Sequence, residues 1–232
     1  MRILAFDHVP TESLGAIETW ASKNGHTVAH HQWYGSTSLP DLSTWDLLFV
    51  MGGPMNIYED SKFPWLATEK AYLDKAIAAG KWLVGICLGS QLLADRLGGQ
   101  VTRNREPEIG WHLIRRQLEA DSDPIFSALP QEFEVMHWHG DTYATPPEAI
   151  QAYSSEACRN QAFRKGHVLG LQCHLELTPH ALDGLVAGFA DEPLGKYVQT
   201  PEQFLSRQNA FAAVKESLYS FLDALEAEIA KS

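Results

Sequence analysis

The first hundred residues alternate between short apolar runs and longer segments in which apolar side chains recur every three or four positions. The short runs predict buried strands, and the longer segments predict helices. The expected strands cover residues 2–8, 26–32, 46–51 and 82–86, and the expected helices cover residues 13–23, 65–79 and 88–97. Strands that alternate with helices of this length predict βαβ units and a mainly parallel sheet.

The pattern changes between about residues 100 and 173, where short apolar runs follow one another without helices between them. These runs predict strands at residues 110–116, 132–138, 150–155, 160–164 and 168–173. Antiparallel hairpins suit such closely spaced strands, so we expect an antiparallel addition to the parallel sheet.

The last part of the chain, about residues 178–229, has a helical pattern again. One apolar face is marked by Phe204, Phe211, Leu218, Phe221, Leu222, Leu225 and Ile229. A stripe of this kind usually packs against the core of its own domain. Because 232 residues suit one large α/β domain, we expect residues 1–232 to form a single domain with these C-terminal helices packed on it.

Composition places the chain among ordinary globular proteins, with 45% hydrophobic and 20% charged residues. Its net charge of −11 argues against a nucleic-acid partner, because phosphate binding relies on clusters of Lys and Arg. No window of about 18 apolar residues occurs, which argues against a membrane span. The apolar start is broken at Asp7 and is too short for a signal peptide. An odd count of three cysteines, Cys87, Cys158 and Cys173, fits the reducing cytoplasm rather than a disulfide framework.

The strongest candidate for chemistry is Cys87, in the segment Val-Gly-Ile-Cys-Leu-Gly-Ser-Gln at residues 84–91. A strand, then Gly-x-Cys-x-Gly, then a helix is the cysteine counterpart of a nucleophile elbow, in which Gly85 and Gly89 leave room for a sharp turn. The positive end of the helix dipole favours a thiolate there, and the free N–H of Leu88 can face an oxyanion. The alternative interpretation is a buried, unreactive thiol.

A nucleophilic thiol requires a base, and the base requires an acceptor that orients it. His174 follows the expected strand 168–173, and Glu176 comes two residues later. Residues i and i+2 of an extended chain point to the same side, so the carboxylate can hold one ring nitrogen while the other faces Cys87. We therefore predict that these three residues form a catalytic triad.

A competing group of side chains is the run His137-Trp138-His139-Gly140-Asp141, in which three metal-ligating types alternate along a strand. Two observations weaken this interpretation. No further cysteine or histidine cluster completes a ligand shell, and the Gly-Asp step is typical of a strand end. We therefore expect no metal and no cofactor. The adjacent His30 and His31 point to opposite faces of a strand and are expected to be structural or exposed.

The blocks at residues 51–54, 85–91 and 172–176 resemble those of the class I, triad-type glutamine amidotransferases. Residues 139–141 look like a fourth block, seen in the amidotransferase domain of GMP synthase. The resemblance implies an α/β fold: a three-layer sandwich around a mainly parallel, flavodoxin-like sheet, with an additional antiparallel strand region. Cys173 and Leu175 depart from the family pattern, which has an aromatic residue and a proline there.

The resemblance also implies roles for individual residues. Cys87 would be the nucleophile, His174 the base and Glu176 its orienting partner. The N–H groups of Gly53 and Leu88 would form the oxyanion hole. Residues implied to hold the substrate are Gln91, Trp138, Gly140 and Asp141.

The function expected from these motifs is hydrolysis of the glutamine side-chain amide through a cysteinyl thioester, which yields glutamate and ammonia. GMP synthase carries an ATP-using domain, but no Gly-x-x-x-x-Gly-Lys-Ser/Thr pattern occurs here, so a separate synthetase subunit is a possible partner. An alternative is a γ-glutamyl peptidase that acts on glutathione-like compounds with the same triad. A third alternative is a non-catalytic binding protein on this scaffold.

Overall fold

The computed structural model describes residues 1–35, 38–186 and 194–232. The strands are β1 (Arg2–Asp7), β2 (Thr27–Gln32), β3 (Leu47–Val50), β4 (Trp82–Ile86), β5 (Val101–Arg116), β6 (Glu132–Tyr143), β7 (Ile150–Ser154), β8 (Ala162–Lys165) and β9 (Val168–Leu171). The helices are α1 (Ala16–Lys23), α2 (Trp65–Ala78), α3 (Leu88–Arg96), α4 (Pro179–Val186), α5 (Pro201–Leu205) and α6 (Ala210–Ile229). The expected C-terminal helical stretch includes residues 187–193, which lie outside the described residues.

The strands form one sheet in the order β2-β1-β3-β4-β9-β8-β7-β5-β6. The first five pair in parallel, and their order is that of flavodoxin-like sheets. The remaining pairs, from β9 to β6, are antiparallel. The predicted fold class is therefore confirmed, and the antiparallel addition contains as many strand pairs as the parallel part.

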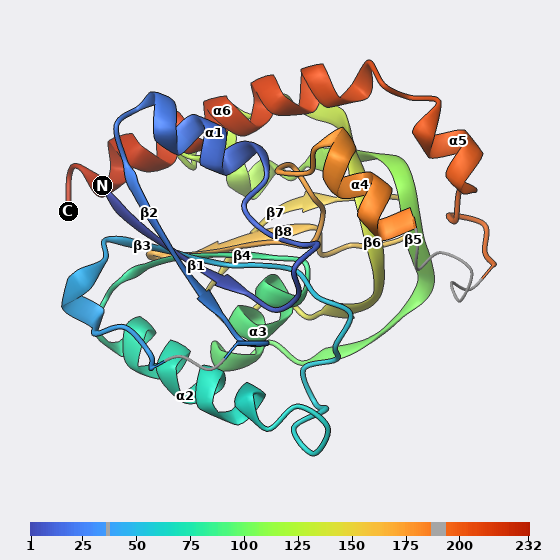
Figure 1. Cartoon of the computed structure of the whole chain (residues 1–232). Coiled ribbons are helices and arrows are strands. Elements are labelled where there is room, and N and C mark those ends of the chain that lie inside the picture. The colour runs from blue at the N-terminus through green and yellow to red at the C-terminus, as the bar shows by residue number, and fades with distance from the viewer. Residues whose placement is uncertain (36–37, 187–193) are drawn as a thin grey trace.

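The sheet lies between two helical layers (Figure 1), with α1 and α6 over one face and α2 and α3 over the other. β3 and β4 are buried along their whole length because helices cover both of their faces. The C-terminal apolar stripe lies on the side of the sheet that carries α1, where Phe204, Leu218 and Leu222 join the core. Phe211 and Ile229 of the stripe are only partly buried.

Helix α1 begins at Ala16 instead of residue 13 because the chain turns sharply just before it. Gly15 has a φ of 52°, and a Cβ there would lie 2.3 Å from the main-chain oxygen of Glu176. The N–H of Ala16 donates to that same oxygen at 2.8 Å. The start of α1 is thus tied to the segment that carries the predicted base.

The two long antiparallel strands extend beyond the predicted ranges. β5 begins at Val101 rather than residue 110, and β6 continues through Gly140 and Asp141 to Tyr143, so the prediction that the strand ends at that step was wrong. The reason is cross-strand pairing: Arg103 pairs with Asp141, and a register shift separates this pair from Glu108. A polar segment that becomes a strand only through such pairing shows no alternation of apolar and polar residues, so its sequence does not predict a strand.

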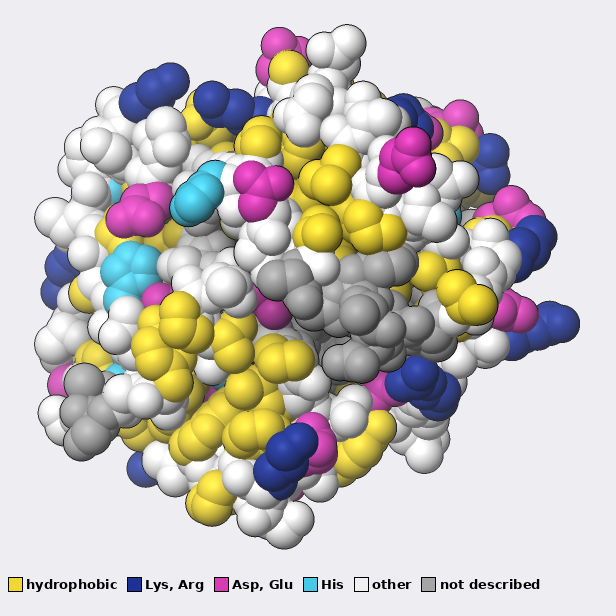
Figure 2. All heavy atoms as spheres, turned by 45° about the vertical axis from the view of Figure 1, so that its right-hand side comes forward, with side chains coloured by type: hydrophobic (Ala, Val, Ile, Leu, Met, Phe, Trp, Pro, Cys, Tyr) yellow, Lys and Arg dark blue, Asp and Glu magenta, His cyan; other side chains and the backbone are white. Residues whose placement is uncertain are grey.

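Within the described ranges, no helix has the length and apolar character needed to cross a membrane. On the face shown in Figure 2, Lys and Arg side chains are spread around the rim, and apolar side chains gather in the lower left part. The basic side chains of this face do not form one central patch, as expected for a chain with a net charge of −11.

Candidate active site

Cys87 lies on the turn between β4 and α3, at the carboxyl end of the parallel strands. Its φ of 50° and ψ of −109° are strained for a residue with a side chain. The turn approaches its neighbours so closely that a Cβ on Gly89 would lie 1.9 Å from the oxygen of Val50. A Cβ on Gly85 would lie 2.4 Å from Gly89 itself. The predicted elbow is thus present, and both flanking glycines are sterically required.

Cys87 is 7% exposed, and its side chain and main chain both have partners. Its sulfur is 3.6 Å from the main-chain oxygen of Trp138. Cys87 and His174 line the same pocket, and their interaction contributes to a raised pKa of His174. The Cys87 N–H donates to Leu171 at 2.8 Å, so the turn is tied to the last residue of β9.

His174 and Glu176 are in contact as predicted, although β9 ends before them, at Leu171. Nδ1 of His174 lies 2.7 Å from Oε1 of Glu176, and both side chains are almost fully buried. The His174 N–H donates to Met136 on β6 at 2.8 Å, which positions the base without a strand around it. Burial alone would lower the pKa of His174. The charge of Glu176, together with hydrogen bonds to Cys87 and Glu176, instead raises this pKa well above its ordinary value.

A pocket of about 450 Å³ opens beside the thiol, a volume typical of small-molecule sites. It is lined by Cys87 and His174, together with all six residues predicted for the oxyanion hole and the substrate, namely Gly53, Leu88, Gln91, Trp138, Gly140 and Asp141. The structure thus brings the predicted site residues to one place.

Two of the predicted substrate residues also hold the pocket wall together. Nε2 of Gln91 donates to Oε1 of Gln172 at 3.1 Å and to the main-chain oxygen of Asp141 at 3.3 Å. The Asp141 carboxylate accepts a hydrogen bond from Tyr58 at 2.8 Å and lies 3.5 Å from Arg103. The Asp141 end of the residue 138–141 segment is therefore fixed by the side chains of Gln91, Tyr58 and Arg103.

A second buried pair, His8 and Glu69, supports the other wall and was not predicted from the sequence. Nε2 of His8 lies 3.1 Å from both carboxylate oxygens of Glu69, and neither side chain is exposed. Nδ1 of His8 lies 3.0 Å from the carbonyl oxygen of Gly52. Because β1 and α2 bring these residues together from 61 positions apart, no local motif announces them.

Glu12 is a further pocket residue that sequence reasoning missed. Gly52 makes room for it: a Cβ on Gly52 would lie 2.2 Å from Oε2 of Glu12 and 3.4 Å from Cε1 of His174. Burial, followed by the nearby charge of Glu176, raises the pKa of Glu12 against the opposing effect of His174. A carboxyl group thus lies beside the imidazole of the base.

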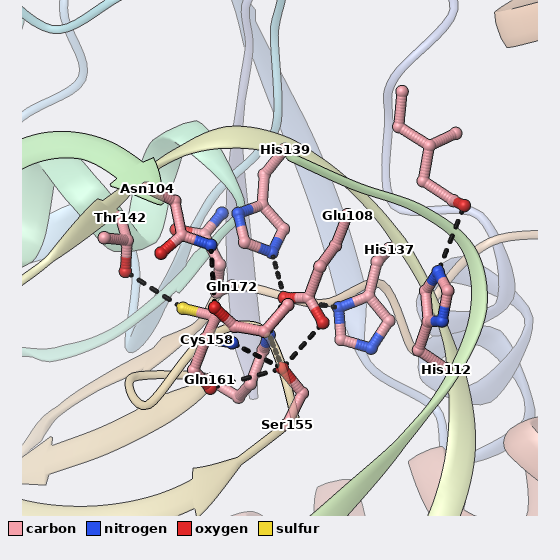
Figure 3. Close-up of polar contacts among 12 residues, drawn as sticks. Asn104, Glu108, His112, His137, His139, Thr142, Ser155, Cys158, Gln161 and Gln172 are labelled. Carbon is pink, nitrogen blue, oxygen red and sulfur yellow. Dashed lines mark hydrogen bonds and ion pairs between the residues drawn. The ribbon is translucent and has the colours of Figure 1, made fainter. Parts of the chain in front are cut away.

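The competing histidine cluster has a different composition from the one predicted. His137 and His139 do lie together, but the carboxylate beside them is that of Glu108 on β5 (Figure 3). The Asp141 carboxylate is bound instead by Tyr58. The prediction from the sequence weighed only further cysteines and histidines, so it did not consider Glu108, which lies 31 positions before His139. Burial lowers the pKa of His137 to about 3. Burial would raise the pKa of Glu108, but its hydrogen bond to His139 and the charges of both histidines lower it to about 2.

The remaining cysteines are free thiols outside the pocket. Burial raises the pKa of Cys158 to about 11, and burial likewise raises the pKa of Cys173. Both are therefore neutral at physiological pH and unsuited to nucleophilic attack.

Comparison with known proteins identifies a family for the chain. The family model described as glutamine amidotransferase class-I matches residues 16–187. The glutamine amidotransferase-like protein YfeJ of Salmonella typhimurium is 30% identical over 234 residues, which cover 97% of each chain. A glutamine-hydrolysing GMP synthase of Thermomicrobium roseum is 31% identical over 140 residues, 60% of this chain and 25% of that protein. The crystal structure of a glutamine amidotransferase from Thermotoga maritima superposes with a TM-score of 0.87 at 30% identity, covering 97% of each chain.

This chain therefore belongs to the class I glutamine amidotransferase family. It is similar to YfeJ from end to end, whereas its likeness to GMP synthase covers only a quarter of that longer protein.

Proposed function

We propose that this protein hydrolyses the side-chain amide of glutamine through a γ-glutamyl thioester on Cys87. The observation that carries the proposal is the arrangement of three buried groups at one pocket. The Cys87 thiol and the His174 ring line the same pocket and interact, and Nδ1 of His174 is held by Glu176 at 2.7 Å. A strained, positive-φ turn presents the sulfur to that pocket.

The chemistry begins with attack of the Cys87 thiolate on the amide carbon of glutamine. His174, protonated on the nitrogen that faces the pocket, then donates its proton to the departing ammonia, and the thioester remains on the sulfur. Water deprotonated by His174 attacks the thioester, and glutamate leaves with the thiolate restored. Glu176 keeps the other ring nitrogen protonated throughout, so the ring keeps one orientation in both half-reactions.

The Gly52–Gly53 peptide supports the proposed oxyanion hole. The peptide is trans, so the Gly52 C=O and the Gly53 N–H point in opposite directions from one plane. His8 holds the Gly52 oxygen at 3.0 Å, which fixes the Gly53 N–H on the other side of the peptide, where Gly53 lines the pocket. With the Leu88 N–H of the first helical turn, it would hold the oxyanion, and each such donor typically contributes about 3 kcal/mol.

A γ-glutamyl peptide is the second candidate substrate, and the extent of the pocket favours it. The pocket of about 450 Å³ reaches beyond the thiol to Pro107, Gly184 and Leu185, which leaves space for a group attached to the γ-carbonyl. In this alternative the leaving group is a peptide amine instead of ammonia, and the triad performs the same steps. For glutamine hydrolysis, a separate synthetase subunit would use the ammonia.

The test is a direct comparison of substrates on the isolated chain. Glutamine and γ-glutamyl dipeptides are assayed for glutamate release, with Cys87→Ala as the control for contaminating activity. Glutamine turnover that is absent from Cys87→Ala supports the proposal, and turnover of dipeptides alone would favour the peptidase.

A glutamine-like electrophile such as acivicin tests the third, non-catalytic alternative. Mass spectrometry after labelling should find the adduct on Cys87 in the wild-type chain. If the folded chain stays unmodified and hydrolyses neither substrate, a binding function replaces the proposed hydrolysis.

A further inference from the structure

Three metal-ligating side chains meet inside the antiparallel part of the sheet, apart from the catalytic thiol. Glu108 on β5 is paired across the strands with His139 on β6, and His137 lies two residues earlier on the same strand. One ligand atom from each side chain lies within 4.8 Å of the other two, and all three residues are buried. Figure 3 shows both rings directed toward the Glu108 carboxylate.

His139 has a fixed tautomer that turns a lone pair toward Glu108. Its Nδ1 lies 2.9 Å from the main-chain oxygen of Asp141, which can only accept, so Nδ1 carries a proton. Its Nε2 then lies 3.0 Å from Oε2 of Glu108. If the His139 ring is neutral, the lone pair of Nε2 faces the Glu108 carboxylate, and the two repel each other. A second proton on the ring or a cation bound between the two groups removes that repulsion.

His137 provides the second, independent observation. Its side chain is completely buried, and neither ring nitrogen has a hydrogen-bond partner among the residues that the structure describes. Its Nδ1 lies 3.9 Å from Oε2 of Glu108, too far for a hydrogen bond. Buried polar groups in native proteins almost always have a partner, which is often a bound water or ion where no protein group is available.

The surroundings of the carboxylate are those of a metal ligand's outer shell. Ser155 donates to Oε1 of Glu108 at 2.6 Å, and Gln161 donates to Oε2 at 2.7 Å. Metal-binding carboxylates are commonly held in this way, and metal-binding histidines commonly donate their other N–H to a main-chain carbonyl, as His139 does.

We propose that Glu108, His137 and His139 bind one Zn²⁺ ion. Tetrahedral zinc separates neighbouring ligand atoms by about 3.3 Å, a value that lies between the two nitrogen–oxygen separations of 3.0 and 3.9 Å. Imidazole and carboxylate ligands suit zinc, and a water molecule completes three protein ligands. The ion replaces the proton that His139 would otherwise need and gives His137 a partner.

The role of this ion is structural, since the cluster does not include the thiol. It links β5 to β6 at His139, which also lines the pocket, and so braces the segment from Trp138 to Asp141. The proposal does not rest on glutamine hydrolysis, because it concerns metal binding alone.

The test measures metal binding in the Cys87→Ala chain, because a pocket thiol and His174 are themselves potential zinc ligands. The tag-free protein is stripped with a chelator and titrated with Zn²⁺, and bound metal is counted by elemental analysis. We expect one zinc per chain and a higher Tm with zinc than without it. His137→Asn and Glu108→Gln should each weaken binding about 100-fold or more, since even outer-shell partners contribute about 10–100-fold.

His112→Asn is the matched control. Its ring lies 5.7 Å from that of His137, but its Nε2 is bound to the Ile109 oxygen at 3.1 Å, so it should not be a ligand. This variant should bind one zinc as the parent chain does. Circular dichroism establishes that each variant is folded before titration, and Glu108→Gln serves if His137→Asn does not fold.

Cobalt provides a second readout of the ligands. Co²⁺ bound by two imidazoles and a carboxylate gives visible bands without a thiolate charge-transfer band. The proposal is overturned if the Cys87→Ala chain binds no stoichiometric metal. It is also overturned if folded His137→Asn and Glu108→Gln bind zinc as tightly as the parent, and a water molecule then becomes the partner of His137.

Discussion

Two buried histidine–glutamate pairs flank Gly52, and they differ in what the second ring nitrogen faces. In the pair His174–Glu176, one nitrogen is held by the carboxylate at 2.7 Å, and the ring also lines the pocket beside the Cys87 thiol. In the pair His8–Glu69, one nitrogen faces the carboxylate at 3.1 Å and the other faces the Gly52 carbonyl at 3.0 Å.

This difference separates the proposed base, His174, from the pair His8–Glu69, a clamp that holds a peptide group. His174 can exchange a proton with a thiol or a substrate, because one of its nitrogens meets the pocket. Both nitrogens of His8 are bound to acceptors, so its ring is held as a double donor that fixes a peptide group. The residue types and the burial are the same, and only the second contact decides the role.

The largest expected effect is on turnover, from removal of the base. His174→Ala should lower kcat for the proposed hydrolysis by about 10²–10⁴-fold, the usual contribution of general acid–base catalysis. Glu176→Gln should have a milder effect because the ring remains and loses only its orienting charge. Glutamate release measures both variants, and thermal unfolding serves as the folding control. Wild-type turnover in His174→Ala would contradict its assignment as the base.

The clamp should show its main effect in stability. His8→Gln leaves the Glu69 carboxylate buried without its positive partner, which should lower the free energy of unfolding by about 3–5 kcal/mol. Urea unfolding measures the loss. The double variant His8→Gln/Glu69→Gln should recover part of the loss, and failure to recover any would show that the two side chains are not coupled.

The stability that the pair His8–Glu69 contributes should depend on pH in one direction. Burial alone would lower the pKa of His8, but Glu69 and the Gly52 carbonyl raise it above the ordinary value of 6.5, with a smaller contribution from Glu12. The stabilisation is therefore complete below about pH 6.5 and is lost as the pH rises through the folded-state pKa, by at most about 1.4 kcal/mol per pH unit.

The measurement is the stability of the wild-type chain minus that of the doubly neutral variant His8→Gln/Glu69→Gln across the same pH range. This reference cancels the titration of His174, which is present in both chains. A difference that grows as the pH rises above about 6.5 would reverse the predicted sign.

The smallest expected effect concerns the strained turn at Cys87. Cys87 has a φ of 50° and a ψ of −109°, where only glycine is unstrained. Cys87→Gly should therefore be more stable than Cys87→Ala by about 1 kcal/mol, although both lack the nucleophile. Urea unfolding of the two inactive chains provides the comparison, and an alanine variant that is at least as stable would show that the turn is not strained.

The sequence predicted those parts of the site that are local along the chain. The strand, Cys87 and the helix after it occupy one short segment, and its glycines have a single steric explanation. His174 and Glu176 are two residues apart, so an extended chain alone brings them together. The alternating helices and buried strands likewise predicted the parallel half of the sheet.

The missed features all depend on contacts between distant segments. Glu69 meets His8 across 61 positions, and Glu108 meets His139 across 31, so neither acid has a local signature. The extra length of β5 has the same origin, because residues 101–108 are mostly polar and become a strand only through pairing with β6. Side-chain contacts between residues far apart in the sequence therefore cannot be found from motifs.

The main-chain hydrogen bond between Cys87 and Leu171 has a consequence for motion. It joins the nucleophile directly to the end of β9, and β4 and β9 are neighbours near the middle of the sheet order. Central strands open less often than the edges of a sheet. We therefore expect the Cys87 sulfur and the start of the segment that carries His174 to move together as one rigid unit. Local opening of the edge strands β2 or β6 should leave the distance between them unchanged.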